Sequence, residues 1–195
     1  MPIYAVVFDM DGTITEPLLD FAQIRKEIGL SPDCPSILDG IEEMDLHSRQ
    51  WAMEILCRHE DQAAKNSTLR DGATALLAEL RRRKIPAGIL TRNSRQSVRR
   101  VLEKHRLTFD GIITREDGPA KPDGFGVLAL CRQFGVAARN TLVVGDYLHD
   151  LLAARNAGSI PVLLSGHPRA QEFADQADFY IRHLDELLPI IDNLS

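Results

Sequence analysis

Short apolar runs alternate along this chain with stretches in which apolar residues recur every three or four positions. The first run, Ile3 to Phe8, is continuous, as expected for a strand that is buried on both faces. Five later runs predict further strands at residues 87–90, 111–113, 141–144, 160–164 and 179–181. Helical spacing predicts helices at residues 73–80, 98–102, 125–134 and 151–157, and a last helix that ends near Ile191.

Residues 18–65 follow a different pattern, with two helical stretches and no convincing strand. The first stretch covers residues 21–28, and the second covers residues 37–55 with an expected break near Leu46. Residues 66–68 are typical of a hinge. Elsewhere the alternation of strands and helices indicates βαβ units. We therefore predict an α/β fold: a Rossmann-like three-layer α/β/α core with a parallel sheet, plus a small all-helical insertion after the first strand.

Composition narrows the class of protein. The 195 residues are 44% hydrophobic and 26% charged, which is ordinary for a globular protein. A net charge of −5 gives no general attraction to nucleic acid, so we expect no nucleic-acid partner. No apolar run is long enough to span a membrane, and the first strand begins at Ile3 without room for a signal peptide. A cytoplasmic protein is the expectation.

The first predicted strand ends in two carboxylates, Asp9 and Asp11, followed by Gly12 and Thr13. Unpaired carboxylates this close to a core repel each other and are costly to desolvate. A cation would relieve both problems, so the segment indicates a metal site. The alternative is an acidic turn in which an aspartate caps a helix and Gly12 supplies an unusual dihedral angle.

Chemically distinctive side chains follow four of the predicted strands. In chain order they are Asp9 with Asp11, Thr91 with Arg92, Lys121, and Asp146 with Asp150. A parallel sheet brings these strand ends to one edge, where ligands bind, so we expect the residues to share a site. Carboxylates bind a hard divalent cation, while a hydroxyl and an ammonium group form an anion pocket. Taken singly, each residue has an ordinary explanation as a strand-end, surface or helix-capping residue.

The sequence resembles the haloacid dehalogenase superfamily of phosphohydrolases, in particular its phosphoglycolate phosphatase-like group. Four segments carry the resemblance, in order and over nearly the whole chain: FDMDGT at residues 8–13, the segment that begins at Thr91, Lys121 with Pro122, and GDYLHD at residues 145–150. The resemblance implies a Mg²⁺-dependent phosphatase that acts on a small phosphorylated metabolite through an aspartyl-phosphate intermediate. It also implies that residues 17–69 form a helical cap on a core made of residues 1–16 and 70–195.

The resemblance assigns roles to individual residues. Asp9 is the implied nucleophile and Asp11 the implied general acid and base, whereas dehalogenases lack an acid at the position of Asp11. Thr91 and Lys121 are implied to hold the phosphoryl oxygens, and Arg92, directly after Thr91, is a candidate for contacting the substrate. The implied Mg²⁺ ligands are Asp9, Asp11 through its backbone carbonyl, Asp146 and Asp150.

Several points stay open at this level. Thr13 either orients Asp11 or closes the turn, and His149 is expected to be a solvated loop residue rather than a metal ligand. Five cap cations either contact a second anionic group of the substrate or form a solvated helix face: Arg25, Lys26, Arg49, Arg58 and Lys65.

Other activities remain compatible with the same motifs. A phosphomutase shares the core, a phosphonate-cleaving relative would need a cap lysine such as Lys26 or Lys65, and a non-catalytic binding protein would not need the acid set intact. The substrate and the oligomeric state cannot be derived from the sequence.

Overall fold

The first apolar run forms the centre of the sheet. In the computed structural model, which describes residues 2–194, strand β1 (Ala5–Phe8) lies between β2 and β4, and all four of its residues are buried. The sheet is six-stranded and parallel throughout, in the order β3-β2-β1-β4-β5-β6. Successive strands are added on one side of β1 as far as β3 and then on its other side from β4 to β6, so the strand order reverses between β1 and β4. Open α/β sheets bind ligands at such a switch point.

The remaining strands agree closely with the predicted runs. Their bounds are β2 (Ala87–Leu90), β3 (Gly111–Ile113), β4 (Thr141–Gly145), β5 (Ile160–Leu164) and β6 (Phe179–Ile181). The predicted α/β class with a parallel sheet and an inserted helical segment is confirmed. β1 is shorter than predicted, since it begins at Ala5 rather than Ile3.

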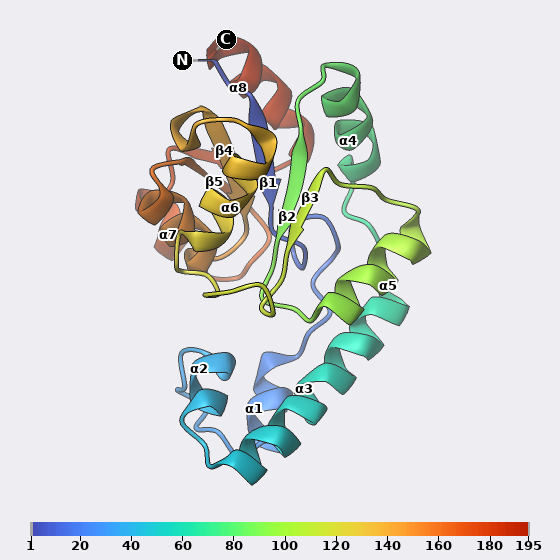
Figure 1. Ribbon diagram of the computed structural model, residues 1–195, viewed down its shortest axis with the longest axis vertical. Helices are drawn as coiled ribbons and strands as arrows, with labels where there is room; N and C mark the ends of the chain where they lie inside the picture. The colour runs from blue at the N-terminus through green and yellow to red at the C-terminus, as the bar shows by residue number, and fades with distance from the viewer. Residues whose placement is uncertain (1, 195) are drawn as a thin grey trace.

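Helices cover both faces of the sheet (Figure 1). Alternating side chains of β1 point to opposite faces, as the pleat of a strand requires. Val6 and Phe8 pack in one apolar cluster with α4 (Ala73–Arg82) and α8 (Leu187–Leu194). Val7 packs in another with α6 (Phe125–Phe134) and α7 (Leu148–Ala157). Three 3₁₀ helices complete this part of the chain: η1 (Ala138–Asn140), η2 (Ala170–Gln176) and η3 (Leu184–Glu186).

The inserted segment contains α1 (Phe21–Glu27), α2 (Ile37–Glu42) and α3 (Leu46–Asn66). These helices share a small apolar core of their own, centred on Ile24, Ile41 and Ile55. The predicted break near Leu46 is confirmed, because the Asp45 carboxylate accepts hydrogen bonds from the backbone N–H groups of His47 and Ser48 and so starts a new helix there.

The end of α3 is joined to the core. Helix α3 runs alongside α5 (Arg95–His105) in Figure 1, and Ala64 near its end packs with Met10, Val98 and Val101. The Lys104 ammonium donates to the carbonyl oxygens of Lys65 and Ser67 at 2.6 and 2.7 Å. The inserted segment is therefore anchored to the core through the last turns of α3 and at the residues that follow.

Two helices begin earlier than predicted. α5 begins at Arg95 rather than at residue 98. α7 begins at Leu148 rather than Leu151, because the Asp150 carboxylate accepts a 3.1 Å hydrogen bond from the Tyr147 N–H and caps the first turn. Within residues 2–194, no helix has both the length and the apolar character that crossing a bilayer demands.

The two faces of α6 provide a test of this packing. Leu130 has no exposed surface, whereas Leu128 is 40% exposed on the same helix. We expect Leu130→Ala to lower the free energy of unfolding by about 2–5 kcal/mol, since it leaves a cavity against the sheet. Leu128→Ala, the matched control, is expected to cost less than about 1 kcal/mol. Urea unfolding measures both, and equal losses would contradict the assigned packing.

Candidate active site

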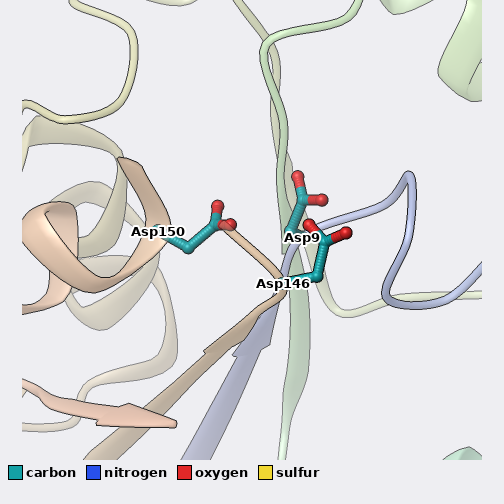
Figure 2. Close-up of side chains that lie close together, drawn as sticks. All are labelled: Asp9, Asp146 and Asp150. Atoms are coloured by element: carbon teal, nitrogen blue, oxygen red, sulfur yellow. The ribbon is translucent and has the colours of Figure 1, made fainter. Parts of the chain in front are cut away.

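Three aspartates meet where β1 and β4 end. Asp9 directly follows β1, Asp146 directly follows β4, and Asp150 lies in the first turn of α7. One carboxylate oxygen from each lies within 4.8 Å of the others, and Figure 2 shows the three side chains gathered at the strand ends. The sequence predicted this convergence, and the structure brings the three residues together at the switch point of the sheet.

Lys121 inserts its ammonium between two of these acids. Its Nζ lies 2.5 Å from Asp9 Oδ1 and 2.5 Å from Asp150 Oδ1, and its side chain is only 4% exposed. Burial alone lowers the pKa of Lys121, but the charges of Asp150 and Asp9 outweigh that effect and raise it, so the ammonium stays protonated. One buried cation therefore contacts two acids of a cluster of three, of which Asp146 and Asp150 are buried and Asp9 is partly buried.

The acid cluster is short of positive charge. Burial, opposed by Lys121 and reinforced by Asp150 and Asp146, raises the pKa of Asp9 well above its ordinary value. Burial, followed by the charge of Asp150, raises the pKa of Asp146 to about 7. Raised pKa values in a crowded, all-oxygen site indicate that a further cation would stabilise the ionised acids. The donor set fits a hard divalent cation such as Mg²⁺.

Two glycines let the backbone approach the acids closely. A Cβ atom on Gly12 would lie 2.1 Å from Asp146 Oδ2, and Gly12 also has a φ of +82°, which L side chains rarely adopt. A Cβ atom on Gly145 would lie 2.3 Å from Asp150 Oδ2. The turn after β1 and the end of β4 thus depend on the absence of a side chain.

Asp11 is held apart from the acid cluster. Its Oδ1 accepts a 3.3 Å hydrogen bond from the Thr15 hydroxyl, and its Oδ2 accepts one from the side-chain amide of Asn93. Burial raises the pKa of Asp11 although the Asn93 hydrogen bond lowers it. A raised pKa favours the protonated carboxyl, which can donate a proton. The predicted contact of its backbone carbonyl with a metal stays a prediction.

Thr15, rather than Thr13, orients Asp11. The Thr13 hydroxyl is buried and has no hydrogen-bond partner within residues 2–194. Sequence reasoning considered only Thr13, because it belongs to the DMDGT segment. Thr15 reaches Asp11 because the chain turns back after Met10, whose carbonyl accepts the Thr15 N–H at 2.9 Å.

Thr91 lies at the same edge of the sheet as Asp9. The register pairs Phe8 with Ile89, so Asp9 directly after β1 and Thr91 directly after β2 both follow strand ends at this edge. The buried Thr91 hydroxyl oxygen accepts a 3.2 Å hydrogen bond from the Asn93 N–H, which leaves the hydroxyl hydrogen able to donate. Its predicted contact with a phosphoryl oxygen remains a prediction.

Arg92 extends from the core toward the inserted helices. Its Nη2 donates to Ser36 Oγ at 2.5 Å and lies 3.6 Å from Asp39 Oδ1, both at the start of α2. Its Nη1 donates to the Lys121 carbonyl at 3.0 Å. Arg92 therefore bridges the two parts of the protein, and substrate contact by this residue stays a prediction.

His149 corrects an expectation. It is not a solvated loop residue but lies half-buried in the first turn of α7, with Nδ1 2.8 Å from Arg92 Nη1. Because the guanidinium donates, Nδ1 accepts and the imidazole proton belongs on Nε2. Burial, with the nearby Arg92 charge, lowers the pKa of His149 to about 4, so the ring is neutral at pH 7.

The fold and the site together define an α/β protein with a cluster of three aspartates at its switch point, a donor set that is suited to a divalent cation. A family model described as haloacid dehalogenase-like hydrolase matches residues 3–158, and the chain belongs to that family. It is accordingly a hydrolase, and the phosphoglycolate phosphatase-like resemblance is confirmed by its relatives.

Three similar proteins illustrate the relationship. A haloacid dehalogenase-like hydrolase domain-containing protein of Arabidopsis thaliana is 29% identical over 203 residues, which cover 96% of this chain and 83% of the relative. A phosphoglycolate phosphatase of Photobacterium profundum is 28% identical over 216 residues, which cover 95% and 94%. The crystal structure of a hydrolase from Pseudomonas syringae matches in fold with a TM-score of 0.81 at 22% identity, covering 98% and 99%.

Gly12→Ala tests the close approach of the turn to Asp146. The new methyl group would overlap the carboxylate, and the positive φ would be strained. We expect divalent-cation affinity to fall by about tenfold or more, since the acid is displaced. Calorimetric titration with Mg²⁺ measures the change. The control is Gly29→Ala, also at positive φ but with no atom within 4 Å of its Cβ position. Equal effects of the two variants would contradict the role of close approach.

The raised pKa of Asp146 predicts a pH dependence. With a folded pKa of about 7 against an ordinary 3.8, the folded metal-free protein binds more protons than the unfolded chain over that interval, so its stability falls as pH rises through it. Cation binding requires ionised Asp146, so Mg²⁺ affinity is expected to rise about tenfold per pH unit up to about pH 7 and then level off. Calorimetric titrations between about pH 5.5 and about pH 8 measure this, and a flat profile would refute it.

Proposed function

We propose that this protein is a Mg²⁺-dependent phosphatase that hydrolyses a small phosphorylated metabolite through an aspartyl-phosphate on Asp9. One observation carries the proposal: Lys121, Asp146 and Asp150 surround Asp9, while Asp11 is held separately by Thr15 and Asn93. The arrangement gives two neighbouring aspartates different environments, as a nucleophile and a proton carrier require.

Asp9, Asp146 and Asp150 would hold the Mg²⁺, together with the backbone carbonyl of Asp11. The ion would supply charge neutralisation that lets an anionic nucleophile approach an anionic phosphate. Lys121 contributes a second positive charge at Asp9 Oδ1, which lowers the pKa of that carboxyl against the larger effect of burial and so favours its ionised form. Thr91 and Lys121 would bind the phosphoryl oxygens, and Arg92 would contact the rest of the substrate.

The chemistry proceeds in two steps. In the first, an Asp9 oxygen bonds to phosphorus, the ester P–O bond breaks, and the protonated Asp11 gives its proton to the leaving oxygen. In the second, the Asp11 carboxylate takes a proton from water, the resulting hydroxide attacks phosphorus, and the bond from Asp9 to phosphorus breaks to release inorganic phosphate. Asp11 ends protonated and Asp9 ends as a carboxylate, so the cycle closes.

The helical insertion supports a small substrate. We infer that residues 17–69 act as a cap over a core made of residues 1–16 and 70–195, because Ser36 on the insertion reaches Arg92 beside the site. A cap excludes water and selects the substrate. A relative of similar length is a phosphoglycolate phosphatase, which agrees with a small phosphorylated compound. The cap lysines Lys26 and Lys65 are both exposed, so neither supports phosphonate cleavage through a buried amine.

Asp9→Asn tests the mechanism directly. We expect Mg²⁺-dependent hydrolysis of p-nitrophenyl phosphate to fall by more than about 1,000-fold, because an amide is not a nucleophile for phosphorus. Release of p-nitrophenol measures the rate, and circular dichroism checks the fold. Asp185→Asn, at an exposed residue of η3, is the matched control and should turn over like the original protein. Undiminished turnover in the Asp9 variant would refute the proposal.

A further inference from the structure

A buried carboxylate from the inserted helices enters the core beside the proposed site. Glu60 lies on α3 and is only 2% exposed, although α3 belongs to the helical insertion. Both of its carboxylate oxygens have partners: Oε1 accepts from Arg115 Nη1, and Oε2 accepts the Ser94 N–H at 3.1 Å. A buried charge without partners would be costly, and here every contact is directed at the core.

Arg115 extends the contact along the loop that follows β2. Its Nη1 donates to the Arg92 carbonyl at 3.1 Å, and its backbone N–H donates to the Asn93 carbonyl at 3.4 Å. Glu60 and Arg115 thus bind backbone groups of three consecutive residues, Arg92, Asn93 and Ser94. A buried ion pair adds little stability compared with apolar packing, so fixing the geometry of this loop is the better explanation for its presence.

The same loop carries the amide that holds Asp11. The Asn93 side chain donates to Asp11 Oδ2, and its backbone carbonyl and the next N–H are the groups bound by Arg115 and Glu60. A shift of the loop would therefore move the donor away from Asp11. Asp61, the next residue of α3, also faces α5 through Arg100, but among the described residues it forms no hydrogen bond or ion pair with this loop.

We propose that Glu60, acting with Arg115, is a positioning residue for Asp11, so that the alignment of the proton carrier depends on the seating of cap helix α3 on the core. The inference rests on the proposed function, because it assigns Asp11 the protonation of the leaving group. Glu60 itself does not touch the substrate. It acts through the loop 92–94 and the Asn93 amide.

Leaving-group dependence distinguishes positioning from a general structural role. Phenolate needs a proton as it departs, whereas p-nitrophenolate leaves readily without one. For Glu60→Gln we expect kcat/KM to fall about 10-fold to 100-fold with phenyl phosphate but about twofold or less with p-nitrophenyl phosphate. kcat/KM is the correct quantity, because it reports the steps up to the first P–O cleavage. Asp61→Asn is the matched control and should leave both values within about twofold.

Two further variants guard against misfolding and indirect effects. Arg115→Lys keeps the charge but loses the guanidinium Nη1, which donates both to Glu60 and to the Arg92 carbonyl. It should show the same selective loss if Glu60→Gln does not fold. The double variant Glu60→Gln with Asn93→Ala should lose no more kcat/KM with phenyl phosphate than Asn93→Ala alone, because Glu60 acts through Asn93. Circular dichroism and thermal melting identify folded variants.

The outcomes separate this inference from the proposed function. A protein with no Mg²⁺-dependent turnover of either ester, or an Asp9→Asn variant that remains active, would refute the proposed function. An active protein in which Glu60→Gln lowers kcat/KM equally for both esters, or for neither, would refute only the role of Glu60. Additive losses in the double variant would also overturn it.

Discussion

Crowding of like charge at the end of β1 is the constraint on which the rest of the site depends. Asp9, Asp146 and Asp150 bring carboxylate oxygens within 4.8 Å of each other in a buried environment. Such a cluster persists only if positive charge is supplied, and Lys121 supplies one unit of it directly to Asp9 and Asp150. Burial, together with this residual imbalance of charge, raises the pKa values of Asp9 and Asp146. A divalent cation would supply the missing positive charge.

The backbone has to be shaped for this crowding. β1 and β4 are adjacent and in register, so their ends deliver acids to the same place, and glycine at positions 12 and 145 leaves room for the carboxylates. Asp150 has a second task, because it caps the first turn of α7 while it faces Lys121. Structural and chemical roles are therefore combined in the same side chain, and neither can be changed without the other.

The local pattern of apolar and polar residues was sufficient to predict most of the fold. Residues 87–90, 111–113 and 160–164 were predicted as strands with the bounds that the structure shows, because each is a short apolar run between breakers. Asp9 and Lys121 were predicted to share a site because strand ends of a parallel sheet converge, and they do. Contacts that depend on how α3 seats on the core, above all Glu60 with Arg115, have no local signal, because the partners are 55 positions apart.

Asp11 and Asp9 belong to one motif but have different environments. Asp11 lies two residues from Asp9, yet its neighbours are a hydroxyl from the returning chain and an amide from the loop after β2 rather than Lys121. The amide belongs to the loop 92–94, which is bound by Glu60 of cap helix α3 and by Arg115 of the core. The clustered acids and Lys121 thus all lie in the core, whereas the surroundings of Asp11, the proposed proton carrier, include a contribution from the cap. A division of this kind would let one core perform the same phosphoryl chemistry while the cap controls when protonation is available.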